Sequence, residues 1–348
     1  MIISIVASVL SLILMLAQGA HTVQAAVDPI EIDGDTASRI VALPAGTNTL
    51  RVAGEDGLYE STESGWSRVA PSPPPGKLVG GDAESGLMMA GDHEPCGRGG
   101  SSVALHRSTD DGQTWSAVDG ATGYRPLAIW PERGLVLASS CLGLHVSRDG
   151  GLTWNPVEGI EPGWEVTSFA AVPQVDEGRP VVLVGLTGEG GTSYLRSIDF
   201  TDPAAPVVSG DLRTYYAIGG LAGEDDTYVL AAMDGVWISE DAGASWERSA
   251  EGLQDVVLER NPAEFGFPAD LDPSRYGLFS AAMLPGERPG IVVGSVDGLY
   301  ISYEDSPGWS RIEGTSGRVN EIVVFGDGTL LLYATDEGVF QADFSTSA

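Results

Sequence analysis

A repeated eight-residue motif most strongly constrains how this chain can fold. The motif reads Ser-x-Asp-x-Gly-x-Ser/Thr-Trp, and three copies match at every fixed position, at residues 108–115, 147–154 and 239–246. A Ser and an Asp can bond backbone groups across a turn, a Gly permits a positive φ, and a Trp can pack beneath the turn. The motif therefore predicts one structural turn used repeatedly, and a fold made of repeated units.

The spacing of the copies predicts the size of each unit. Weaker copies begin at Ser61, Ser197 and Ser302, and Ala342 takes the equivalent place in a last one. Successive first positions are 47, 39, 50, 42, 63 and 40 residues apart. Repeats of about 40–50 residues usually contain four strands. The residues assigned to the turn are Ser108, Asp110, Gly112, Trp115, Ser147, Asp149, Gly151, Trp154, Ser239, Asp241, Gly243 and Trp246.

Apolar β-rich runs separated by turn residues precede each motif, and a short polar run follows its Trp. We therefore predict an all-β fold, a seven-bladed β-propeller of four-stranded antiparallel blades that spans residues 26–348 as one domain. Residues 28–33 are expected to supply the outer strand of the last blade, so that the N- and C-terminal strands close the ring. The one long interval maps to an insertion at residues 251–274, which is either a functional loop or a tolerated one.

The N-terminal residues 1–25 are predicted to be a signal peptide. Residues 2–16 form an uncharged apolar run, and Val23 and Ala25 fit the small-residue positions before a cleavage site after Ala25. No Lys or Arg precedes the run, and an uncleaved N-terminal anchor is the alternative. Both interpretations place the domain outside the cytoplasm, secreted or periplasmic.

The chain has two cysteines, Cys96 and Cys141, and an oxidising compartment favours one disulfide between them. His93 and Glu94 lie near Cys96, but these residues lack the compact spacing of a metal site. No phosphate-binding loop, serine nucleophile elbow or zinc-protease motif is present. We therefore expect no metal and no cofactor.

The net charge is −31, from 49 acidic and 18 basic residues. Such a surface repels phosphates, which excludes bulk binding to nucleic acid or to anionic membranes. We expect a monomer with no membrane insertion beyond the N-terminal segment. The acidic excess could also reflect solubility or adaptation to salt.

Several of the few basic residues recur just before or at the start of a predicted first strand. Because first strands line the centre of a propeller, these residues predict a positive central patch suited to a carboxylate, sulfate or phosphate. The alternative is that each cation pairs with a neighbouring Asp or Glu. The candidate ligand-binding residues are Arg39, Lys77, Arg125, Arg213, Arg275 and Arg318.

The repeated motif resembles the Asp-box, or BNR, repeat of sialidases, the sortilin ectodomain, xyloglucan-processing glycosidases and propellers like photosystem II assembly factors. The resemblance covers nearly all of residues 27–345 and implies a propeller, with Asp110, Asp149 and Asp241 as structural residues. It is not specific for function, because the motif occurs in enzymes and in binding proteins alike.

A sialidase would use three arginines to hold the sugar carboxylate, a Tyr nucleophile paired with Glu, and an Asp acid/base. By resemblance Arg39 stands where the first arginine would lie, although the flanking aromatic and Pro are missing. Tyr276 is a nucleophile candidate with Glu259 or Glu264, and His93, His106 and His145 could serve acid/base chemistry.

We therefore expect an exported binding module for an unknown protein or carbohydrate ligand, with an anionic ligand at its central face. The alternative is an exo-acting glycoside hydrolase of sialidase-like fold, and the identity of any catalytic residue stays open.

Overall fold

The computed structural model describes residues 22–32, 35–43, 49–62, 65–81, 84–93, 103–160, 163–172, 180–188, 193–214, 216–258, 275–286, 288–325, 328 and 330–344. In these residues the regular structure is β-sheet, apart from one 3-10 helix, η1 (Pro131–Arg133). The predicted all-β class is confirmed. Within the same ranges, no helix is long and apolar enough to cross a membrane.

The strands follow one another at short intervals. In chain order they are β1 (Thr22–Val23), β2 (Ala26–Pro29), β3 (Glu31–Ile32), β4 (Asp35–Thr36), β5 (Arg39–Ala42), β6 (Arg51–Ala53), β7 (Gly57–Thr62), β8 (Gly65–Pro71), β9 (Lys77–Gly80), β10 (Met88–Gly91), β11 (Ala104–Ser108), β12 (Ser116–Thr122), β13 (Arg125–Trp130), β14 (Leu135–Ser140), β15 (Gly143–Ser147), β16 (Asn155–Pro156), β17 (Glu165–Val172), β18 (Val181–Thr187), β19 (Ser193–Asp199), β20 (Val207–Thr214), β21 (Ile218–Glu224), β22 (Thr227–Ala232), β23 (Gly235–Ser239), β24 (Glu247–Ser249), β25 (Leu278–Leu284), β26 (Gly290–Ser295), β27 (Leu299–Tyr303), β28 (Ser306–Ile312), β29 (Glu321–Phe325), β30 (Leu330–Thr335) and β31 (Gly338–Asp343).

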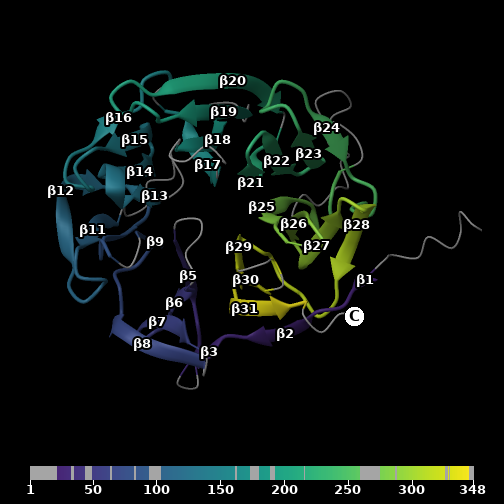
Figure 1. Cartoon of the computed structure of the whole chain (residues 1–348), viewed down its shortest axis with the longest axis horizontal. Helices are drawn as coiled ribbons and strands as arrows, with labels where there is room; N and C mark the ends of the chain where they lie inside the picture. The colour runs from purple at the N-terminus through teal and green to yellow at the C-terminus, as the bar shows by residue number, and fades with distance from the viewer. Residues whose placement is uncertain are drawn as a thin grey trace, which may run out of the picture.

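The sheets form a β-propeller arrangement, with one strand of each group innermost around a central axis (Figure 1). Four sheets have four strands each: β13 to β16, β17 to β20, β21 to β24, and β29 to β31 with β2. A fifth sheet contains β25 to β28 and β1. Consecutive strands within these groups pair antiparallel, as in β14 with β15 and β22 with β23.

The predicted arrangement of seven four-stranded blades is borne out only in part. Five sheets have four or five strands, and one large sheet has eight, in the order β12-β11-β10-β9-β5-β6-β7-β8. The fusion arises because β5 pairs parallel with β9, through Val41 with Leu78 and Ala42 with Val79. Short inner strands converge at the central axis, so two of them can come close enough to form backbone hydrogen bonds. The sequence pattern does not reveal such a pairing.

The predicted terminal strand is also shifted. Residues 28–33 were expected to lie beside the last repeat, but the paired residues are Ala26 to Pro29, which run antiparallel to β31. Glu31 and Ile32 instead form a small hairpin with β4. The Ile30 amide still donates to the Val339 carbonyl at 2.9 Å, so contact with the last repeat extends to Ile30, whose side chain is buried.

Middle strands are buried on both faces, whereas outer strands are exposed. All six residues of β14 are buried, while most of β12 is exposed. This difference explains why continuous apolar runs and polar runs alternate within each repeat. Buried side chains pack between neighbouring groups of strands: Leu137 and Leu144 share one cluster with Val182 and Ile198.

Arginines connect neighbouring repeats on the face that carries the turn motifs. The buried guanidinium of Arg51 bonds Glu60 beside it and both oxygens of Asp111 in the turn between β11 and β12. Arg107 donates from Nε to the Gly150 carbonyl at 2.6 Å, and Arg148 donates to the Pro203 carbonyl at 2.5 Å. Each contact fixes one turn motif or outer turn against the preceding repeat.

Candidate functional site

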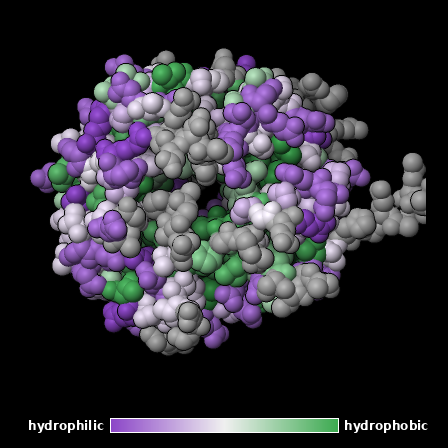
Figure 2. Space-filling view, in the orientation of Figure 1, coloured by the Kyte–Doolittle hydropathy of each residue, from purple (hydrophilic) through white to green (hydrophobic). Residues whose placement is uncertain are grey.

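The innermost strands enclose a central cavity of about 1010 Å³, and one face of the molecule is hollowed at this position (Figure 2). Residues of β5, β9, β13, β17, β21, β25 and β29 line it. The walls are mainly apolar, with Leu127, Phe169, Leu221 and Ile322 among the lining side chains. A cavity of this size and composition is typical of a small-molecule site.

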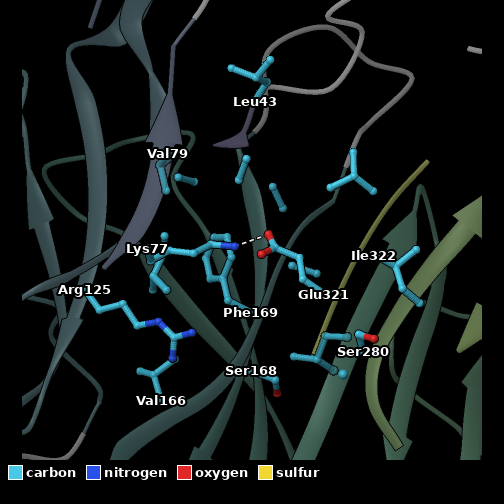
Figure 3. A pocket seen from close by; sticks show the side chains of 18 of the residues that line it. Leu43, Lys77, Val79, Arg125, Val166, Ser168, Phe169, Ser280, Glu321 and Ile322 are labelled. Carbon is cyan, nitrogen blue, oxygen red and sulfur yellow. Dashed lines mark hydrogen bonds and ion pairs between the residues drawn. The ribbon is translucent and has the colours of Figure 1, made fainter. Parts of the chain in front are cut away.

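Charged residues gather at the end of the cavity where the inner strands begin. Lys77 starts β9 and Glu321 starts β29, and their side chains form an ion pair across the opening (Figure 3). The two side chains are 21% and 24% exposed, so the pair is shielded from bulk water. The sequence analysis found Lys77 but missed its partner, which lies 244 residues away.

Arg125 starts β13 beside this ion pair (Figure 3). Its Nε lies 3.8 Å from Asp92 Oδ1, which is too long for a hydrogen bond. The same Nε is buried and has no hydrogen-bond partner within the described ranges. The Arg125 side chain as a whole is 43% exposed, as is that of Asp92, so a ligand can reach the guanidinium, while Asp92 supplies a nearby counter-charge.

Arg318 adds a third cation near the same end. Its guanidinium carbon lies 3.8 Å from the centre of the Phe279 ring, and its Nε donates to Asn320 Oδ1 at 3.0 Å. Phe279 and Asn320 both line the cavity. The structure thus brings three of the six predicted cations, Lys77, Arg125 and Arg318, toward one end of the cavity.

Arg318 itself is not a lining residue, and the other three predicted cations do not line the cavity either. Arg39 donates to the carbonyls of Pro74 and Gly76 at 2.8 and 2.9 Å, so a loop uses its guanidinium, and burial lowers its pKa. Arg213 lies on β20, the outermost strand of its sheet, and is exposed. Arg275 is exposed as well. Arg39, Arg213 and Arg275 therefore do not lie at the cavity as predicted. For Arg213 the reason is that an arginine near a strand boundary in the sequence can belong to the preceding outer strand.

The three complete turn motifs have one hydrogen-bond pattern. Ser239 Oγ donates to Asp241 Oδ1 at 2.8 Å and accepts from the Gly243 amide at 2.8 Å. The amide and hydroxyl of Ser245 donate to the same carboxylate. These bonds lower the pKa of Asp241 to about 2. The Asp110 and Asp149 carboxylates bond in the same way, so all three are engaged within their turns.

A further arginine position recurs that the sequence analysis overlooked. Arg68, Arg248 and Arg311 each lie two residues after a motif Trp and donate to the carbonyls of Asp56, Asp234 and Asp297 at 2.6, 2.7 and 2.7 Å. Each is paired across the sheet with an aromatic residue, namely Tyr59, Trp237 or Tyr300. The shared spacing after Trp is the signal that could have identified them as structural.

Each of the three candidate histidines contacts different groups. His145 is buried, with Nε2 2.8 Å from Ser140 Oγ and Nδ1 3.3 Å from the Tyr124 hydroxyl, and burial lowers its pKa. His93 contacts Ser139, and His106 contacts the Ala104 carbonyl. Among the residues that the structure describes, no group of three or more His, Cys, Asp or Glu could hold a metal ion.

Several predicted features fall outside the described ranges. Glu259 and Glu264, the proposed partners of Tyr276, lie there, as does Cys96; Cys141 is disulfide-bonded. The insertion at residues 251–274 is described only to residue 258, and Leu253, Val256 and Val257 in this part are buried against the neighbouring sheets.

No family model matches the chain, and no curated protein was found to be similar to it.

Proposed function

We propose that the chain is an exported binding module, built as a closed seven-bladed propeller with Asp-box turns, that holds a small ligand at the central cavity. The eight-stranded sheet then counts as two blades, because β5 to β8 and β9 to β12 each pair antiparallel in chain order. Only the β5 to β9 pairing joins them.

Packing supports the closed ring. Seven buried clusters occur in the described residues, and each combines side chains from two consecutive blades. One of them joins Val52 and Tyr59 of the first blade to Leu332 and Val339 of the last. The pairing of β2 with β31 adds the N-terminal strand to the last blade.

The shared bonding of Ser and Asp in the three turns supports the Asp-box likeness, and the disulfide at Cys141 fits an oxidising compartment outside the cytoplasm. The class of ligand is inferred from the residues that line the cavity. We propose an amphipathic small molecule whose carboxylate or sulfonate binds Arg125 and whose apolar part contacts Phe169 and Leu127. The observation that carries this proposal is that the partly exposed Arg125 lines the cavity beside apolar residues such as Leu127 and Phe169, and that no hydrogen bond of the described residues uses its Nε.

Fluorescence titration with anilinonaphthalene sulfonate tests the proposal, because this probe joins an anionic group to an apolar body. A charge-assisted hydrogen bond accounts for about 1.5–3 kcal/mol, so Arg125→Gln should weaken binding about 10- to 100-fold. Arg275→Gln is the matched control, since it removes the same charge from an exposed position outside the cavity lining. Equal affinities of the two variants would reject the assigned site.

A glycoside hydrolase of sialidase-like fold is the less favoured alternative. It needs three arginines that converge on one carboxylate, but the described cavity lining includes only Arg125 and Arg133. Arg125 starts the six-residue β13, which is about 20 Å long, whereas Arg133 lies in η1 beyond the other end of that strand. Release of a fluorophore from sialosides or other glycosides would restore the enzyme proposal.

A further inference from the structure

Residues 22–29 form one extended segment that joins the edges of two sheets. Thr22 and Val23 pair parallel with Arg311 and Ile312 at the edge of β28, and Ala26 to Pro29 pair antiparallel with β31. Figure 1 shows β1 beside β28 and β2 along β31. The segment therefore links the sixth and seventh groups of strands, counted from β5, in addition to the packing between them.

Burial along the segment alternates as in a strand that covers a core. Val23, Ala25 and Val27 are partly buried and pack against a cluster that includes Ile312 and Ala342. The residues between them are exposed. This period of two continues without interruption from residue 22 to residue 28, so the residues before and after Ala25 belong to the same structural element.

Polar contacts hold the first half of the segment. The Glu313 amide donates to the Val23 carbonyl at 2.9 Å, and the Gln24 side-chain amide donates to the Glu313 carboxylate. Hydrogen bonds from Gln24 and from Thr22 lower the pKa of Glu313. Three successive residues thus contact the end of β28 directly or through Glu313.

This arrangement conflicts with the cleavage site predicted from the sequence. Val23 and Ala25 are small residues of the kind that precede a cleaved bond, but in the fold they are the inward-facing residues of this segment. Hydrolysis of the peptide bond between Ala25 and Ala26 would release the strand paired with β28 and leave only the part paired with β31.

We propose that residues 22–25 remain in the mature protein as the first half of a two-sheet clasp, and that any processing bond lies before Thr22. The processing step rests on the proposed export, whereas the clasp does not. The two parts can therefore fail separately.

The full chain, produced in a host that exports it, is analysed by intact mass and N-terminal sequencing. The inference predicts that every mature chain includes Thr22, whether or not the apolar segment is removed. A mature N-terminus at Ala26, or at any residue after Thr22, would overturn it. If the chain is not exported, the proposed export fails, and the clasp is still tested by the following pair of variants.

Ala25→Asn and Ala26→Asn provide that test, because these adjacent alanines point in opposite directions. Both are made in the full chain, and mass spectrometry verifies that residues 22–25 are present before melting is measured. Ala25→Asn should lower the melting temperature by about 2–6 °C because it buries an amide, while Ala26→Asn should leave it unchanged. Equal melting temperatures would overturn the clasp.

Discussion

Replacing Arg51 by Met should destabilise the propeller, because it breaks a buried ionic contact between two repeats. Arg51 is 6% exposed; its Nε bonds Glu60 at 2.8 Å, and its two terminal nitrogens bond the carboxylate of Asp111. Burial disfavours the guanidinium charge, but the hydrogen bonds and charges of Asp111 and Glu60 outweigh this effect and raise the pKa of Arg51. The arginine is therefore charged at every accessible pH.

The expected loss of stability depends on the two carboxylates that are left without a partner after the substitution. Removing one member of a buried ion pair costs about 3–5 kcal/mol when the other charge stays trapped. Here Glu60 and Asp111 are 26% and 36% exposed, so water can partly solvate them. We expect a loss of about 2–3 kcal/mol in the free energy of unfolding, which corresponds to a drop of about 3–5 °C in melting temperature for a domain of this size.

Urea unfolding followed by tryptophan fluorescence measures this loss, with Arg213→Met as the control for removing an exposed arginine. The double variant Arg51→Met, Asp111→Asn measures the coupling energy, and Asn tolerates the positive φ of 60° at this position. Coupling of about 1 kcal/mol or more is expected. If Arg51→Met costs no more than Arg213→Met, the assigned role of this contact between repeats is wrong.

Two further predictions concern titrating groups. Burial lowers the pKa of His145, so as the pH falls below about 6.5 the unfolded chain binds a proton that the folded chain does not. The free energy of unfolding should therefore decrease in this range. His145→Phe should reduce that decrease, as measured by melting curves at about pH 5 and 7. An unchanged pH dependence in His145→Phe would contradict this assignment. The Asp241 carboxylate has a pKa of about 2 in the folded state, so its contribution is complete above about pH 4 and is lost toward pH 2. The stability difference between the wild type and Asp241→Asn should shrink over the same range, and a constant difference would refute the role of the charge.

Local features of the sequence predicted the repeated structure well. The Ser, Asp, Gly and Trp of the turn motif act within eight residues, so their contacts depend little on the rest of the fold. Strand order followed from the same repeat, because each unit supplies its own hairpins. The β5 to β9 pairing and the hydrogen bonds of β1 could not be predicted this way, since they depend on how close separate units come in space.

The candidate site was predicted only in part for the same reason. Lys77 and Arg125 were found because they begin inner strands, but Glu321, which pairs with Lys77, is 244 residues away. Arg39 and Arg213 follow the same sequence rule and lie elsewhere, one bound by loop carbonyls and one on an outer strand. Side-chain partners distant in the chain decide which cations are available to a ligand.

A crystal structure of the protein soaked with anilinonaphthalene sulfonate tests the central claim most directly. We predict the sulfonate within hydrogen-bond distance of the Arg125 guanidinium, with the aromatic rings inside the cavity against Phe169 and Leu127. Density for the probe only on the outer surface, with the cavity empty, would contradict it.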